Sequence, residues 1–210
     1  MKSSARVRSR LLVIGLAATV AIGAAACGDD VAPHSLVGFR PSAEQRVDTV
    51  PIPDASAGGQ PFVFRAEPDG LLLVSFGYTQ CPDVCPTTMA SVRSGLRLME
   101  DEAENIGLAM VTVDPVRDTP EVLTGFVQSF VPGAHALRTD DVQVLRQVSD
   151  LFGVTFNIAT NDDGEVGVSH SGLLYVVDDT GVVRLSWPFG VKSADIAADL
   201  ELLLDEGSAV

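Results

Sequence analysis

Apolar residues along the chain fall into short, nearly continuous runs that alternate with amphipathic stretches. The runs Leu71–Phe76 and Leu108–Val113 are mostly apolar, as in strands that are buried on both faces. Between them, apolar residues recur at steps of three and four, which predicts a helix from Pro86 to about Asp101. The buried stripe of this helix is expected to comprise Met89, Val92, Leu96 and Met99. Strands and helices that alternate in this way predict an α/β fold.

The second half of the chain continues the alternation. Thr119 followed by Pro120 is typical of a helix N-terminus, and Asp140 or Asp141 opens another helix. The first of these helices is expected to pack Val122, Phe126 and Phe130, and the second Val144, Leu145, Val148, Leu151 and Phe152. Residues 173–187 predict two strands joined by a turn, and Ala194–Leu204 predicts a closing helix. We therefore expect a central mixed sheet flanked by helices.

The N-terminal segment has the features of a secretion signal. Four basic residues precede Leu11–Ala26, an uncharged run of sixteen residues that is short for a membrane-spanning helix. The run ends in "GAAACGDD", which resembles the lipobox of bacterial lipoproteins and implies acylation of the Cys27 thiol. The alternative is an ordinary secretory signal with an unmodified cysteine nearby. Anchoring by two or more acyl chains would hold the protein firmly at a membrane surface.

These features divide the chain into three parts. Residues 1–26 are the expected signal peptide, residues 27–47 a lipid-anchored tether, and residues 48–210 the folded domain. The tether mixes Pro, Gly, Ser and isolated apolar residues, and a flexible chain of about twenty residues spans roughly 25 Å. We expect the domain to be held on the outer face of the bacterial cytoplasmic membrane, with His34 solvated in the tether.

Composition narrows the possible partners. Apolar residues make up 46% of the chain, enough for a core without disulfide scaffolding. Without the four basic residues of the signal, the mature chain carries 10 basic and 28 acidic residues, a net charge of −18. Such a surface repels nucleic acid, so no nucleic-acid partner is expected. The charge favours a basic protein partner or simply keeps the domain soluble; we prefer the second interpretation and expect a monomer.

Two of the three cysteines, Cys81 and Cys85, lie where the strand Leu71–Phe76 passes into the first helix, and each is followed by proline. Unpaired N–H groups and the helix dipole at such a place favour an anionic sulfur. A gap of two residues would suggest a redox pair of the thioredoxin type. The gap here is three, which places the sulfurs about one turn apart if both residues are helical, a separation suited to gripping a metal ion.

The stretch "GYTQCPDVCPTT", with "VTVDPVRDTP" and "SHSGLLYVVDDTG" after it, resembles the SCO/SenC family of copper-binding proteins with a thioredoxin-like fold. The resemblance implies copper ligands at Cys81, Cys85 and His170, and a role in building the dinuclear copper centre of cytochrome c oxidase. The implied partner is the copper-binding subunit of that oxidase, whereas the copper donor is not implied. Gln80 stands where relatives often have His or Asn. No proline precedes the strand at Leu173, which counts against a general thioredoxin activity.

The implied donor set suits copper in either oxidation state. Thiolates are soft ligands that select Cu(I), and imidazole also accommodates Cu(II). Two thiolates and a neutral imidazole leave bound Cu(II) formally uncharged, so that burial is tolerable. A structural zinc site, which wants four ligands, and a plain disulfide that closes a small loop remain as alternatives.

Other conspicuous residues have simpler interpretations beside a role in the site. Asp83 either tunes the thiols, contacts a partner or caps the helix, and Asp114 either supports the site or forms the turn before Pro115. Met89 and Met99 belong to the buried stripe rather than to a copper site. His135 is expected at the edge of a strand and not as a ligand. "NDDGE" at 161–165 is expected to be a hairpin turn, because it lacks the ligand spacing of a calcium loop.

Three functional hypotheses follow. The first is a copper metallochaperone, which is not an enzyme, that delivers copper to the oxidase. The second is a thiol-disulfide oxidoreductase that keeps the copper-binding cysteines of the oxidase subunit reduced, with Cys81 and Cys85 as its redox-active pair. The third is a lipoprotein with a vestigial dithiol.

Overall fold

The computed structural model of the chain describes residues 35–160 and 166–207. Cys27, His34 and the "NDDGE" stretch lie outside the described residues. In chain order, the described strands are β1 (Ile52–Asp54), β2 (Gln60–Phe62), β3 (Leu71–Gly77), β4 (Ile106–Thr112), β5 (His135–Leu137), β6 (Phe156–Thr160), β7 (Val166–His170), β8 (Leu173–Asp178) and β9 (Val183–Pro188). The α-helices are α1 (Val84–Leu98), α2 (Pro120–Phe130), α3 (Val142–Phe152) and α4 (Ser193–Gly207), with short 3-10 helices at Ala55–Ala57 and Glu100–Asn105.

A mixed sheet forms the centre of the domain, as predicted. The strand order is β2-β1-β5-β4-β3-β8-β9, and β6 pairs with β7 in a separate two-stranded sheet. β3 runs parallel to β4 and antiparallel to β8, so it lies inside the sheet, and all seven of its residues are buried. The chain therefore reaches the predicted cysteines from the best-protected strand of the fold.

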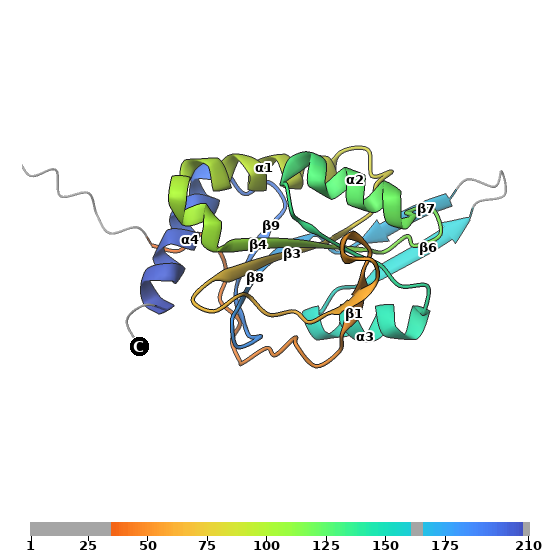
Figure 1. The fold of residues 1–210 in the computed structure, drawn as a ribbon, viewed down its shortest axis with the longest axis horizontal. Helices are drawn as coiled ribbons and strands as arrows, with labels where there is room; N and C mark the ends of the chain where they lie inside the picture. Colours follow the sequence, from red (N-terminus) through yellow and green to blue (C-terminus); the bar gives the residue numbers. More distant parts are fainter. Residues whose placement is uncertain (1–34, 161–165, 208–210) are drawn as a thin grey trace, which may run out of the picture. The chain divides into compact units, whose positions relative to one another are not determined.

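Helices cover both faces of the sheet (Figure 1). One apolar cluster joins the sheet to α1, α2 and α4, through residues such as Met89, Leu123 and Leu200. The other joins the opposite face to α3, through Leu145 and Phe152. Successive residues of β3 alternate between the two clusters, as the pleat of a strand requires. The predicted architecture, a central mixed sheet flanked by helices, is confirmed.

The helices begin and pack largely as the sequence predicted. All four members of the α1 stripe are buried. Thr119 accepts a hydrogen bond from the N–H of Val122, so it caps α2. The prediction for α2 is wrong at Val122, however, which is 47% exposed, and it omits Leu123 and Val127, which are buried. Phe126 and Phe130 are partly buried and pack edge to face against each other.

The tether predicted for residues 27–47 ends earlier than expected, because its last part packs on the domain. The buried carboxylate of Asp199 accepts hydrogen bonds from the N–H groups of Val37 and Gly38 and from the indole of Trp187. Phe39 pairs with Ser186 of β9, and Val47 is fully buried. A buried carboxylate needs such partners, and the backbone of the segment supplies them. The predicted domain boundary at residue 48 is therefore too late.

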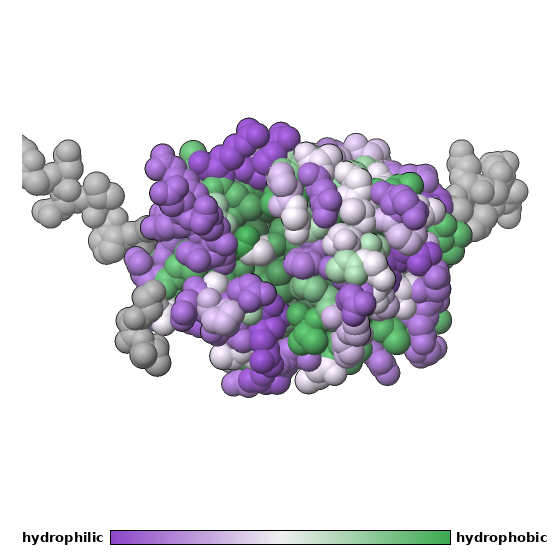
Figure 2. Space-filling model, in the orientation of Figure 1, coloured by the Kyte–Doolittle hydropathy of each residue, from purple (hydrophilic) through white to green (hydrophobic). Residues whose placement is uncertain are grey.

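The surface is largely hydrophilic but has local apolar areas. On the face drawn in Figure 2, apolar residues gather in a hollow in the middle, and hydrophilic residues surround it. Large exposed apolar side chains occur in several elements, among them Leu98, Val116 and Phe189. Within the described residues, no helix is both long and apolar enough to cross a membrane.

Candidate metal centre

The two cysteines lie at the junction of β3 and α1, where the sequence placed them. Cys81 lies in the turn before the helix, and Cys85 lies in the first turn of α1. Both side chains are buried, with exposed fractions of 9% and 4%. Because Cys81 precedes the helix, the two sulfurs are not related by a helical turn. The two residues are instead linked by a hydrogen bond, in which the backbone N–H of Cys85 donates to the Cys81 sulfur over 3.3 Å.

Cys81 is the more acidic thiol of the pair. Burial raises its pKa, but hydrogen bonds from the Cys85 thiol and from the backbone N–H groups of Cys85, Asp83 and Val84 outweigh burial and lower the pKa below the ordinary value. These N–H groups are the unpaired donors at the start of α1. The expected stabilisation of a thiolate at the helix N-terminus therefore applies to Cys81.

Cys85 behaves in the opposite way. Burial, and then the hydrogen bond and negative charge of Cys81, raise the pKa of Cys85 to about 12. Cys81 is therefore the first of the two thiols to ionise, and Cys85, which keeps its proton longer, donates it to the Cys81 sulfur. Loss of that proton is favoured only when something positive approaches the pair.

Gly77, the last residue of β3, allows Cys85 to approach the sheet closely. A Cβ atom on Gly77 would lie 2.8 Å from the Cys85 sulfur and 2.9 Å from Cε of Met110. Any other residue at this position would push the helix start away from the strand. The sequence contained this signal, a glycine directly after a buried strand, but its role was not predicted.

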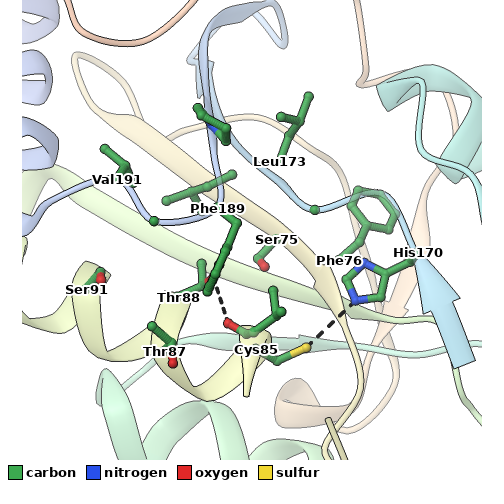
Figure 3. A pocket seen from close by; sticks show the side chains of 15 residues that line it. Ser75, Phe76, Cys85, Thr87, Thr88, Ser91, His170, Leu173, Phe189 and Val191 are labelled. Atoms are coloured by element: carbon green, nitrogen blue, oxygen red, sulfur yellow. Dashed lines mark hydrogen bonds between the residues drawn. The ribbon is translucent and has the colours of Figure 1, made fainter. Parts of the chain in front are cut away.

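His170 reaches the cysteines from the end of β7 (Figure 3). Its Nε2 atom lies 3.8 Å from the Cys85 sulfur, and its Nδ1 atom lies 3.0 Å from the carbonyl oxygen of Ser171. A carbonyl only accepts hydrogen bonds, so Nδ1 carries the proton and the Nε2 lone pair faces the sulfur. The edge of the Tyr78 ring also contacts the imidazole, with ring centroids 6.1 Å apart.

The structure therefore brings the predicted ligands together through Cys85, which contacts both Cys81 and His170. Across residues 35–160 and 166–207, no three His, Cys, Asp or Glu side chains are already gathered closely enough to enclose a metal ion. Binding an ion here requires the Cys81 sulfur and the His170 ring to close on it. Two sulfurs and an imidazole nitrogen with a free lone pair form a donor set that suits copper.

The two predicted carboxylates occupy different positions relative to the site. Asp83 is exposed at the N-cap position of α1, where its carboxylate accepts from the Thr87 hydroxyl and does not cap the helix. Asp114 is buried and forms a short ion pair with Arg117. Arg117 in turn donates to the side chain of Gln80 over 3.3 Å and lies over the Tyr78 ring. Asp114 thus acts on the cysteine loop through Arg117.

Asp118 supports the cysteine loop more directly, and the sequence did not reveal it. Its carboxylate is fully buried and accepts hydrogen bonds from the N–H and the hydroxyl of Thr79, the latter at 2.5 Å. It also accepts from the Thr112 hydroxyl at 2.5 Å. Asp118 therefore ties the chain between β3 and Cys81 to the end of β4. Its position next to the helix cap Thr119 gave no sign of this role.

His135 lies away from the cysteines, as expected. It is the first residue of β5, and its Nδ1 atom lies 2.6 Å from the buried carboxylate of Asp54. The His135 ring also packs against Phe62. The residue has a structural environment of its own, and nothing places it near the thiols.

Comparison with known proteins relates the chain to one family. The model of the SCO1/SenC family matches residues 63–205. An SCO2-like protein of Rickettsia prowazekii is 34% identical over 138 residues, which cover 65% of each chain. Thus the chain spans less than two thirds of the length of such curated relatives.

Solved structures resemble the domain over nearly their whole length. Apo Sco1 of Thermus thermophilus superposes with a TM-score of 0.70 at 29% identity, covering 82% of this chain and 99% of that one. ScoI of Bradyrhizobium japonicum with copper bound gives a TM-score of 0.62 at 26% identity, with 80% and 99% covered. The fold is therefore thioredoxin-like, as the resemblance implied.

Proposed function

The chain belongs to the SCO1/SenC family, and on that basis we propose that it is a copper carrier that holds the ion with Cys81, Cys85 and His170. It delivers the ion to the dinuclear copper centre of cytochrome c oxidase during assembly of that enzyme. The observation that carries the proposal is the contact of Cys85 with both other ligands, at 3.3 Å from the N–H of Cys85 to the Cys81 sulfur and 3.8 Å from the Cys85 sulfur to Nε2 of His170.

The chemistry of the three residues supports copper as the cargo. The proton of His170 is held on Nδ1 by the Ser171 carbonyl, so Nε2 is ready to bind a metal ion without a change of tautomer. Cys81 ionises more readily than an ordinary thiol, and an arriving cation displaces the thiol protons that remain. Two thiolates and a neutral imidazole leave Cu(II) with no net charge and Cu(I) with one negative charge.

Release proceeds by ligand exchange without a change in oxidation state. Each bond from copper to Cys81, Cys85 or His170 is replaced by a bond to a ligand of the acceptor, and the freed sulfurs take up protons again from the solvent. His170 comes from a different segment than the cysteines, so it can leave the ion while the sulfurs still hold it. In the proposed setting, acylated Cys27 holds the domain on the outer face of the cytoplasmic membrane, where it meets the oxidase.

The decisive experiment compares His170→Ala with His135→Gln in the full chain. Anaerobic copper titration of the wild type should saturate near one equivalent. His170→Ala should lose more than about 100-fold in copper affinity, since removing a ligand costs at least as much as removing its hydrogen-bond partner. His135→Gln changes a histidine outside the site and should bind copper like the wild type. Equal affinity in all three proteins would remove His170 from the site.

A second candidate function, thiol-disulfide exchange, is favoured by the lowered pKa of Cys81 and its hydrogen bond to Cys85. In that reaction Cys81 and Cys85 are oxidised to a disulfide, and a disulfide in the oxidase subunit takes up two electrons and two protons to become two thiols. This reaction does not need His170. The copper content of the oxidase in cells that carry His170→Ala therefore separates the two functions. It should decrease if the protein is a copper carrier and stay unchanged if the protein is a thiol reductase.

A further inference from the structure

A pocket opens beside the metal ligands, between the first turns of α1 and the loop that follows β9 (Figure 3). The pocket is small, with a cavity volume of about 20 Å³, and it opens to solvent on one side. Cys85 and His170 point toward each other at one side of it, and Leu173, Phe189 and Val191 lie around the rest. Access to the ligands from this side therefore crosses a rim made of these apolar side chains and of Thr87, Thr88 and Ser91 on α1.

The rim carries no formal charge. Eleven of the residues that line the pocket reach the surface, and none of them is Asp, Glu, Lys or Arg. In a chain in which 20% of the residues are charged, about two would be expected among eleven. The cores of protein interfaces are depleted in charge in the same way, because a charge that a partner covers loses its hydration without compensation.

Two large apolar side chains of the rim are exposed, and they come from different segments of the chain. Phe189 is 48% exposed in the loop after β9, and Leu173 is 37% exposed at the start of β8. Gly190, with φ of 89°, lets the chain turn directly after Phe189. An exposed aromatic residue beside a functional site is typical of a residue that anchors a partner.

We propose that this neutral rim, whose apolar part is formed by Val84, Leu173, Phe189 and Val191, is the surface on which the copper-accepting protein docks. The proposal rests on the carrier function above. Ligand exchange requires the acceptor to bring its own ligands to the ion between Cys85 and His170, and such an approach places the acceptor over the rim. Since the rim offers apolar area and no charge, the face of the acceptor around its copper ligands is an uncharged, apolar loop.

The test measures copper loading and copper transfer separately, with the full chain and the copper-binding domain of the oxidase subunit as acceptor. Phe189→Ser and Leu173→Ser remove exposed apolar area from the rim. Leu98→Ser is the matched control, because Leu98 is 57% exposed at the other end of α1, about 20 Å along the helix from Cys85. Both rim variants should load copper like the wild type and transfer it at least about tenfold more slowly, and Leu98→Ser should transfer at the wild-type rate.

Three outcomes would overturn the docking surface. In the first, the rim variants transfer copper as fast as the wild type. In the second, they fail to load copper, which would make these residues part of the metal site itself. In the third, sedimentation shows a dimer that Phe189→Ser dissolves, so that a second copy of the chain covers the rim. A wild-type chain that loads no copper would instead refute the carrier function, and the docking surface would fall with it.

Discussion

Selective alkylation of the two thiols tests the electrostatics of the site. Cys81 has a pKa below the ordinary thiol value of 9.0, whereas burial and the neighbouring thiol raise the pKa of Cys85 to about 12. At pH 7 more than about 1 in 100 Cys81 thiols is ionised, against about 1 in 100,000 Cys85 thiols. The Cys85 thiolate is the more basic of the two and is therefore intrinsically more nucleophilic, by about 30-fold. This partly compensates for the roughly thousandfold smaller fraction of Cys85 that is ionised. Cys81 should therefore react at least about 30-fold faster.

The assay is a time course with iodoacetamide under anaerobic conditions, read by peptide mass spectrometry so that Cys27 is counted separately. Cys81→Ser provides the internal check. It removes the hydrogen bond and the negative charge that raise the pKa of Cys85, so Cys85 should react faster in this variant than in the wild type. Burial, the largest cause, still keeps it slower than an ordinary thiol. Equal rates at the two cysteines in the wild type, or an unchanged rate at Cys85 in Cys81→Ser, would refute this order of ionisation.

Three further predictions concern stability and geometry. Asp118→Ala leaves the buried donors of Thr79 without a partner and should cost about 3 kcal/mol in urea unfolding, while exposed Asp150→Ala should cost little. Gly77→Ala should lower copper affinity together with about 1–3 kcal/mol of stability, because its Cβ collides with Cys85; unchanged copper titration would contradict this. Burial raises the pKa of Tyr175 to about 12, so the unfolded chain loses that proton first and the unfolding free energy should fall from pH 10 to 12, less steeply in Tyr175→Phe.

Much of the fold was predictable because its main elements are strongly patterned. The sequence runs of β3 and β4 are mostly apolar, as expected for strands that are buried on both faces. The apolar residues of α1 form a single stripe, so only one face of that helix can be the buried one. In α2 two adjacent rows are apolar, one with Phe126 and Phe130 and one with Leu123 and Val127. Periodicity identifies the helix, but only packing against the sheet decides which row is buried.

The segment before residue 48 was mispredicted for a different reason. Its attachment depends on the buried carboxylate of Asp199, which lies about 160 residues further along the chain and accepts from two backbone N–H groups. Backbone N–H groups are present in every sequence, so a hydrogen-bond partner of this kind leaves no pattern to find. The same limit applies to Asp118, whose carboxylate binds a backbone N–H and two hydroxyls and resembles an ordinary residue before a helix cap.

The candidate site was predictable to different degrees. The spacing of Cys81 and Cys85 pointed to paired sulfur chemistry without help from relatives. His170 was proposed only through the family resemblance, because a single histidine before a strand has no pattern of its own. The structure supplies the physical link: β7 ends at His170 and β8 begins three residues later beside β3, so the short connection carries the ring to the start of α1.

Copper binding and thiol-disulfide exchange exclude each other, because both use the lone pairs of the same two sulfurs. A disulfide between Cys81 and Cys85 uses the sulfur electrons that would otherwise bind copper, and bound copper withholds both sulfurs from an incoming disulfide. Because Cys81 is more acidic than Cys85, a disulfide and a copper ion react with the pair in different ways. A disulfide is attacked by Cys81, the thiol that ionises readily, whereas copper must also displace the proton of Cys85 and recruit the imidazole. His170 therefore distinguishes the metal-bound state of the pair from its redox chemistry, which is why a change at this residue separates the two functions.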